Sequence, residues 1–125
     1  MKAIYNKNNS LVGWYDQKQD YVFSKDLIWI GFIENGNFFS GNLEWIGGLK
    51  KGTFLDKQGH PIGWIDGSLP LESENLKQPL TPKRKKPPLK PLAPLQPLQS
   101  LPPLPPLGGW SKLDWNEYIK SIDSK

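Results

Sequence analysis

An internal repeat in the first half of the chain constrains the fold more than any other feature. A Val-Gly or Ile-Gly dipeptide occurs four times, with 18, 16 and 16 residues from one glycine to the next: Val12-Gly13, Ile30-Gly31, Ile46-Gly47 and Ile62-Gly63. Repetition at a nearly fixed period indicates one supersecondary unit copied along the chain. Aligned on these glycines without gaps, the chain gives four 14-residue units, at residues 3–16, 21–34, 37–50 and 53–66.

Each unit has the pattern of a β-hairpin. Two apolar residues lie nine and eight positions before the glycine: Ile4-Tyr5, Val22-Phe23, Phe38-Phe39 and Phe54-Leu55. A turn-rich centre follows the pair, and a second apolar segment surrounds the glycine, as in two strands joined by a tight turn. Asn9 and Gly59 suit the left-handed conformation that such a turn requires. Asn35-Gly36 and Lys51-Gly52 are two-residue turn signals between units.

Eight short strands in one antiparallel meander leave two reactive edges unless the ends meet. We therefore predict an all-β fold in which four hairpins form a closed, shallow ring or small barrel with pseudo-fourfold symmetry. With about eight strands, side chains just fill the interior of such a ring.

Alternation along a strand predicts which side chains form the core. The residues before and after each glycine should share one face, and the glycine should lie on the other. The predicted repeat core comprises Val12, Ile30, Ile46 and Ile62, then Trp14, Phe32 and Trp64, together with Gly13, Gly31, Gly47 and Gly63. A glycine that recurs at one strand position suggests that a backbone or an aromatic ring approaches its bare Cα closely. Trp29 and Trp45, two residues before their glycines, are expected to cover these glycines; the alternative is exposure for stacking on a ligand or sugar.

The fourfold pattern of an apolar pair, a turn and an Ile-Gly-aromatic segment ending on an acid, followed by a proline-rich tail, resembles the 4-fold beta flower domain family. The resemblance covers about residues 3–66. It implies a shallow all-β assembly of hairpin petals, without a catalytic residue to carry over. The third unit departs from the pattern, with Gly48 and Lys50 in place of an aromatic residue and an acid. A weaker similarity is to choline-binding repeats, which need several aromatic residues to cage a quaternary ammonium.

The composition argues against catalysis and against a metal site. The chain has 125 residues, no Cys and a single histidine, His60, so neither a thiolate site nor a multi-histidine site can form within one chain. We interpret His60 as a surface turn residue, and Asp16, Glu34 and Asp66 as a solvated rim rather than a cation site. We expect no enzymatic activity, no cofactor and no bound metal. A hydrolase that depends on His60 is a distant alternative.

The charge is concentrated in the second half of the chain. The formal net charge of +4 arises entirely after residue 66, and Lys83, Arg84, Lys85 and Lys86 form a run that suits weak contact with an anionic surface. No aromatic residue lies between residues 67 and 109, so we expect no specific nucleic-acid binding. Residues 1–10 lack the apolar run of a signal peptide, and no segment approaches the roughly 20 apolar residues of a membrane span. We expect a cytoplasmic protein that is not transmembrane.

A second periodicity occupies the proline-rich segment. Leucine recurs at every third position, at Leu89, Leu92, Leu95, Leu98, Leu101, Leu104 and Leu107. A polyproline II helix has about three residues per turn, so these leucines would form one straight ridge. Two interpretations stay open: a stiff spacer, or a binding face for an aromatic-lined groove. The pattern Lys85-x-x-Pro88-x-x-Pro91 also suits such a groove.

The last residues read as a short amphipathic aromatic helix. Ser111 and Asp114 form a reasonable N-cap pair, and the apolar side chains that share a face at helical spacing are Trp115, Tyr118, Ile119 and Ile122. This face needs a surface. The ring of the same chain, another copy of the chain and a different protein are equally open.

The sequence thus divides into a four-hairpin domain at residues 1–67, a basic and Pro/Leu-rich linker at 68–109, and a C-terminal docking segment at 110–125. The favoured function is a non-enzymatic protein-interaction or assembly module. It would engage a protein partner or associate with itself through the leucine ridge, Trp110, Trp115 and Tyr118. The alternative is a small-ligand or lipid-binding domain that uses the Trp/Phe surface of the ring.

Overall fold

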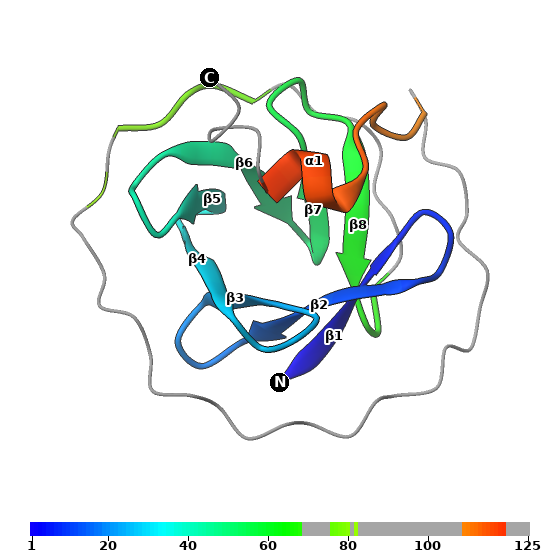
Figure 1. The fold of residues 1–125 in the computed structure, drawn as a ribbon. Helices are drawn as coiled ribbons and strands as arrows, with labels where there is room; N and C mark the ends of the chain where they lie inside the picture. The colour runs from blue at the N-terminus through cyan, green and yellow to red at the C-terminus, as the bar shows by residue number, and fades with distance from the viewer. Residues whose placement is uncertain (69–75, 81, 83–108, 120–125) are drawn as a thin grey trace.

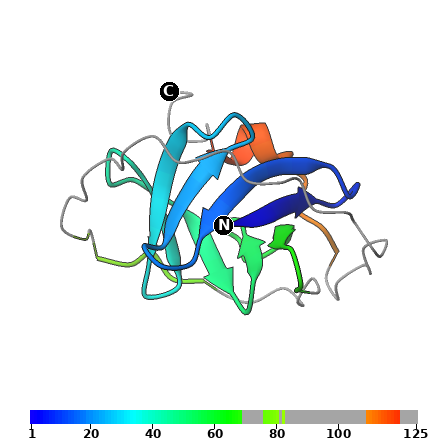
Figure 2. The ribbon, with the colours of Figure 1, turned by 90° about the horizontal axis from the view of Figure 1, so that it is seen from below.

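The computed structural model describes residues 1–68, 76–80, 82 and 109–119, and these form a closed antiparallel barrel with one short helix. The strands follow one another around the ring in chain order: β1 (Lys2–Asn6), β2 (Leu11–Asp16), β3 (Tyr21–Ser24), β4 (Trp29–Glu34), β5 (Asn37–Ser40), β6 (Trp45–Lys50), β7 (Thr53–Leu55) and β8 (Pro61–Ile65). Pairing of β1 with β8 closes the ring, with Ile4 opposite Ile65. The helix α1 (Trp115–Ile119) lies across β6, β7 and β8 at one mouth (Figure 1). Figure 2 shows α1 at one rim of the shallow ring. The predicted all-β closed ring is confirmed.

The four hairpin turns share one hydrogen-bonding scheme. A side-chain oxygen of the first turn residue accepts hydrogen bonds from the backbone N–H groups two and four positions later, at 2.9 to 3.3 Å. The residues that supply this oxygen are Asn6, Ser24, Ser40 and Asp56. Local bonds of this kind stabilise turns and replace ladder bonds that the backbone cannot make there.

One residue in each turn adopts a positive φ, three positions after the residue whose side-chain oxygen accepts these hydrogen bonds. The values are 62° at Asn9, 66° at Leu27, 67° at Leu43 and 88° at Gly59. The predictions for Asn9 and Gly59 are confirmed. The two leucines were not foreseen, because a left-handed conformation places the Cβ of an ordinary residue against its own backbone. The Asn35-Gly36 and Lys51-Gly52 links also have positive φ at both residues, as a two-residue hairpin turn requires.

A β-bulge in every hairpin changes the faces that alternation predicted. Ile4 pairs with Gly13 but Tyr5 pairs with Leu11, so Val12 is an extra residue without a partner. The register shifts at the equivalent place in the other three hairpins. A bulge interrupts the two-residue alternation. The prediction that Val12 and Trp14 share a face is therefore wrong: Val12 packs against the interior cluster, and Trp14 belongs to a second cluster.

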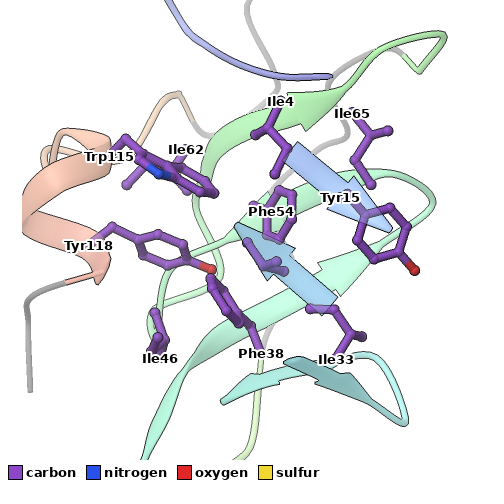
Figure 3. Packing of buried hydrophobic residues seen from close by; sticks show 11 residues of the cluster. Ile4, Tyr15, Ile33, Phe38, Ile46, Phe54, Ile62, Ile65, Trp115 and Tyr118 are labelled. Carbon is purple, nitrogen blue, oxygen red and sulfur yellow. The ribbon is translucent and has the colours of Figure 1, made fainter. Parts of the chain in front are cut away.

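The barrel interior is built from three equivalent sets of side chains, one residue from each hairpin. Figure 3 shows members of each set, among them Phe38, Ile33 and Ile46. The first set is Ile4, Val22, Phe38 and Phe54, the second is Tyr15, Ile33, Leu49 and Ile65, and the third is the bulge residues Val12, Ile30, Ile46 and Ile62. Outside the barrel, Trp14 and Trp64 cluster with Tyr5 and Phe23, and Phe32 stacks on Phe39 at 5.7 Å between ring centroids. The aromatic residues after the repeat glycines thus line the outer face.

The repeat glycines make room for the backbone of the following hairpin. A Cβ on Gly13 would lie 2.6 Å from the carbonyl oxygen of Phe23, and one on Gly63 would lie 2.8 Å from that of Tyr5. Gly31 and Gly47 face the carbonyls of Phe39 and Leu55 even more closely. The predicted close approach of backbone is confirmed, whereas the expectation that Trp29 covers one of these glycines is wrong. For Trp45 the expectation stays a prediction. The Trp29 ring lies against Gly41 instead.

The departure of the third unit from the repeat has a local structural reason. Gly48 occupies the outer-face position that holds Trp14, Phe32 or Trp64 elsewhere. The side chain of Leu76, from beyond the four hairpins, lies over it, and its Cδ1 would be 3.1 Å from a Cβ on Gly48. Leu76 therefore takes the place of the missing aromatic side chain.

Candidate functional site

The C-terminal segment, residues 109–119, docks on the fourth hairpin turn of its own ring. The hydroxyl of Ser111 donates a hydrogen bond to Oδ2 of Asp56 at 2.6 Å, and the backbone N–H of Ser111 donates to the carbonyl of Pro61 at 2.7 Å. Both Asp56 and Ser111 are buried. The Trp110 ring lies 5.9 Å from that of Trp64, between centroids. A buried, charge-assisted hydrogen bond fixes this end of the segment firmly.

Asp56 is suited to this contact because the turn uses only one of its oxygens. Oδ1 accepts hydrogen bonds from the N–H groups of Gln58 and His60, both at 2.9 Å. Oδ2 is left to accept from Ser111. Asn6, Ser24 and Ser40 at the equivalent positions have no second carboxylate oxygen. Sequence reasoning missed this pair, although Asp56 is the only acid among the four turn-opening residues.

The helix α1 begins with a reciprocal cap formed by Asp114 and Glu117. Oδ1 of Asp114 accepts from the N–H of Glu117 at 2.7 Å, and Oε1 of Glu117 accepts from the N–H of Asp114 at 3.3 Å. This is the capping-box arrangement with an acid at each end. Asp114 is the N-cap. Ser111 bonds to Asp56 and to the N–H of Leu113 instead, so the predicted capping role of Ser111 is wrong.

Trp115 and Tyr118 extend from α1 into the mouth of the barrel (Figure 3). Trp115 meets Phe54 edge-on at 5.2 Å between ring centroids, and Tyr118 lies 5.7 Å from Phe38. The hydroxyl of Tyr118 donates to the carbonyl of Leu55 at 3.0 Å. Burial, and secondarily the charge of Asp56, raises the pKa of Tyr118 well above its ordinary value. This hydroxyl therefore stays protonated and acts as a structural donor.

Two repeat glycines also accommodate the helix. A Cβ on Gly47 would lie 3.0 Å from the hydroxyl oxygen of Tyr118, and one on Gly63 would lie 3.5 Å from the Trp115 ring. Ile46 and Ile62, the bulge residues beneath α1, are buried, whereas Val12 and Ile30 on the other hairpins are half-buried. The helix thus covers the third and fourth hairpins at this mouth.

These contacts settle where the described part of the terminal segment goes: it packs on the ring of its own chain. Trp115 and Tyr118, predicted as interaction residues, are buried at 3 % and 1 % exposure, and Trp110 is half-buried. Ile122 lies outside the described residues.

A cavity of about 510 Å³ lies between the fourth turn and the docked segment. The turn contributes Asp56, Lys57, Gln58 and His60; the segment contributes Trp110, Ser111, Lys112, Leu113 and Tyr118; and Ile46 completes the lining. His60, predicted as a surface turn residue, is half-buried here.

The other predicted site residues have the following positions. The leucine ridge from Leu89 to Leu107 and the basic run Lys83–Lys86 lie outside the described residues. Trp29 and Trp45 are half-buried, and their indole N–H groups are buried without an acceptor. Within residues 1–68, 76–80, 82 and 109–119, no three acids or histidines gather as a metal site would require. The described part of the chain contains no helix with the length and hydrophobicity needed to span a membrane.

The fold defines a class of protein: a closed ring of four equivalent hairpins with a C-terminal segment inserted at one mouth. A family model described as 4-fold beta flower protein matches residues 2–119. The chain belongs to this family, and the match extends past the hairpins through the docked helix, further than the resemblance at residues 3–66. Neither the curated proteins nor the solved structures contain a match.

Proposed function

We propose that this protein is a non-enzymatic interaction module whose ring holds a Pro/Leu arm, residues 83–108, at both ends for a protein partner. The arm itself lies outside the described residues. The observation that carries the proposal is the docking of the C-terminal segment through Ser111, Trp115 and Tyr118. On the other side of the arm, Leu76 lies against Gly48 of the ring. Described residues that precede and follow the arm in the sequence, Leu76 and Ser111, thus both contact the ring.

Anchoring at both ends supports binding in physical terms. A free proline-rich tail loses conformational entropy when a partner orders it. Anchoring both ends of the arm lowers its conformational entropy before the partner binds, so less entropy is lost on binding. The Lys85-x-x-Pro88-x-x-Pro91 pattern suits a partner groove lined with aromatic residues. The docked aromatic residues then serve as the anchor of the arm, and the leucine ridge and prolines serve as the contact surface.

The alternative of ligand or lipid binding on the aromatic surface of the ring has less support. Trp14, Phe32 and Trp64 are buried at 4 %, 0 % and 7 % exposure. Among the described residues, the large apolar side chains that are exposed are Met1, Ile28 and Leu80. The side chains of Trp14, Phe32 and Trp64 therefore offer no free face to a ligand.

The proposal is tested with purified SH3 domains that select Lys/Arg-x-x-Pro-x-x-Pro ligands. Titration calorimetry compares the full chain with a synthetic peptide of residues 83–108. We expect binding of both, with the full chain about tenfold tighter because its arm is anchored. Changing Pro88 and Pro91 to Ala should abolish binding, and changing the seven leucines to Gln should weaken it. Absence of binding by both chain and peptide would refute the interaction role of the arm.

A matched variant isolates the anchor. Changing Trp115 and Tyr118 to Ala releases the segment while leaving the arm sequence intact, and the affinity should fall to that of the peptide. Inserting one residue after Leu98 turns the last three leucines of the ridge by about a third of a turn. If the leucine variant and the insertion both bind like the parent chain, the ridge has no contact role.

A further inference from the structure

The cavity between the fourth turn and the docked segment has the size of a small-molecule site. Its volume of about 510 Å³ lies within the roughly 300 to 1,000 Å³ of typical ligand pockets. The described residues that line it come from the ring and from the docked segment, and they do not include Trp14, Phe32 or Trp64. One side is the turn 56–60 and the other is the segment 110–113.

The apolar part of the lining is firmly held. Ile46 and Tyr118 are each 1 % exposed, and Leu113 packs against the interior cluster. Trp110 is fixed by its contact with Trp64. Ile46 and Tyr118 thus form the rigid floor of the cavity, and the half-buried side chains of Trp110 and Leu113 supply the apolar surface that a ligand can contact.

The polar part of the lining favours a negative group. Among the described residues that line the cavity, Asp56 is the only acid, and its two oxygens accept hydrogen bonds from Gln58, His60 and Ser111. Lys57 extends from the turn and Lys112 from the docked segment, both exposed. Lys57, Lys112 and Asp56 together give the described lining a formal net charge of +1. One lysine therefore lies on each wall, and the carboxylate between the walls is already hydrogen-bonded.

We propose that this cavity binds a small anionic amphiphile of the monocarboxylate class. The apolar body lies against Trp110 and Leu113, and the carboxylate lies between Lys57 and Lys112. Charge complementarity selects the sign of the head group, and the apolar surface selects a hydrocarbon or aromatic body.

The site also couples ligand binding to docking of the C-terminal segment. The ring supplies one wall of the cavity and the docked segment supplies the other, so a bound ligand contacts both. Release of the segment removes one wall, and the ligand then no longer binds. A ligand that binds only the docked state stabilises that state by mass action. The same ligand should therefore raise the thermal midpoint of the full chain and slow amide exchange in residues 110–119.

The experiment uses the full chain labelled with ¹⁵N and three ten-carbon probes below their micelle concentrations: decanoate, decan-1-ol and decyltrimethylammonium. Decanoate should shift the indole N–H of Trp110 and the amide of Gln58 saturably, with an affinity at least about tenfold higher than that of decan-1-ol. Decyltrimethylammonium should not bind. Equal affinity for the acid and the alcohol, or shifts confined to other parts of the ring, would overturn the proposal.

Charge reversal gives a matched control. Lys57→Glu with Lys112→Glu should reduce decanoate affinity by about tenfold or more. Lys25 occupies the position of Lys57 in the second hairpin turn, so Lys25→Glu with Lys51→Glu changes the net charge equally without touching the cavity and should leave binding unchanged. All four lysines are exposed, and thermal melts check that both variants fold. Equal loss in both variants would reduce the effect to general electrostatics and refute the site. SH3 binding by the arm is independent of this result.

Discussion

The hydroxyl of Ser111 donates a 2.6 Å hydrogen bond to Oδ2 of Asp56, a partner 55 residues earlier in the chain. This one bond links the turn of the last hairpin to the segment that precedes α1. It shows that the C-terminal residues belong to the folded barrel. The family match through residue 119 agrees with this extent.

Ser111→Ala should destabilise the protein by about 1 to 3 kcal/mol, because it leaves a buried carboxylate oxygen of Asp56 without its donor. Urea unfolding followed by tryptophan fluorescence measures the change. Ser10→Ala is the control: Ser10 is exposed in the first hairpin turn, and its replacement should stay within about 0.5 kcal/mol. Equal effects of the two changes would contradict a stabilising role of the Ser111–Asp56 bond.

Substitution of the repeat glycines should be costly in a graded way. Gly31→Ala places a Cβ deep within the carbonyl of Phe39, whereas Gly63→Ala places one 2.8 Å from the carbonyl of Tyr5. Overpacking of this kind typically costs about 1 to 3 kcal/mol. We expect Gly31→Ala to be the more destabilising in urea melts, and Gly31→Val to be worse still despite the preference of Val for strands. A neutral valine variant would show that the close approach has no energetic weight.

Two substitutions at equivalent positions of the hairpin turns should change the stability of the protein in opposite directions. Leu43 has φ 67° and Asn9 has φ 62° at the equivalent position. Asn tolerates this conformation better than Leu does. Leu43→Asn should therefore stabilise the protein by up to about 1 kcal/mol, and Asn9→Leu should destabilise it by a similar amount. Thermal and urea melts of the two variants give the signs directly, and the same sign for both would refute the argument from backbone strain.

The free energy of unfolding should fall in alkaline solution because the hydroxyl of Tyr118 is buried in the folded protein. The pKa of Tyr118 is raised in the folded protein, chiefly by burial, so the unfolded chain loses this proton first. The contribution of the protonated hydroxyl is complete below the unfolded pKa of about 10 and is lost as pH rises above it. Urea melts between pH 8 and pH 11 should show this decline. Tyr118→Phe should be less stable at pH 8 but should show a shallower decline, and an unchanged slope would contradict the assignment.

The repeat could be predicted from the sequence because each hairpin encodes its own turn and its own apolar pair. Asn9, Gly59 and the Asn35-Gly36 link are local signals, and closure follows from the cost of free strand edges. The inward position of Val12 could not be predicted by alternation, because a bulge depends on how the partner strand pairs. The positive φ of Leu43 could not be predicted for a related reason: the fold imposes this backbone conformation on a residue that does not favour it.

Only part of the docking of the C-terminal segment could be predicted from the sequence. The helical spacing of Trp115 and Tyr118 indicates an apolar face, but it does not identify the surface that covers this face. That surface is formed by Phe38, Phe54 and Leu55 of the distant ring. Long-range contacts of this kind depend on the assembled barrel.

NOE spectroscopy of the full chain tests directly whether α1 is inserted in the mouth of its own barrel. We predict NOEs between the ring protons of Trp115 and Phe54, and between those of Tyr118 and Phe38, whose ring centroids lie 5.2 and 5.7 Å apart. These cross-peaks should persist on dilution, as intramolecular contacts do. Random-coil shifts for residues 110–119 without such cross-peaks, in a sample whose strands are folded, would show that α1 does not occupy the mouth of the barrel.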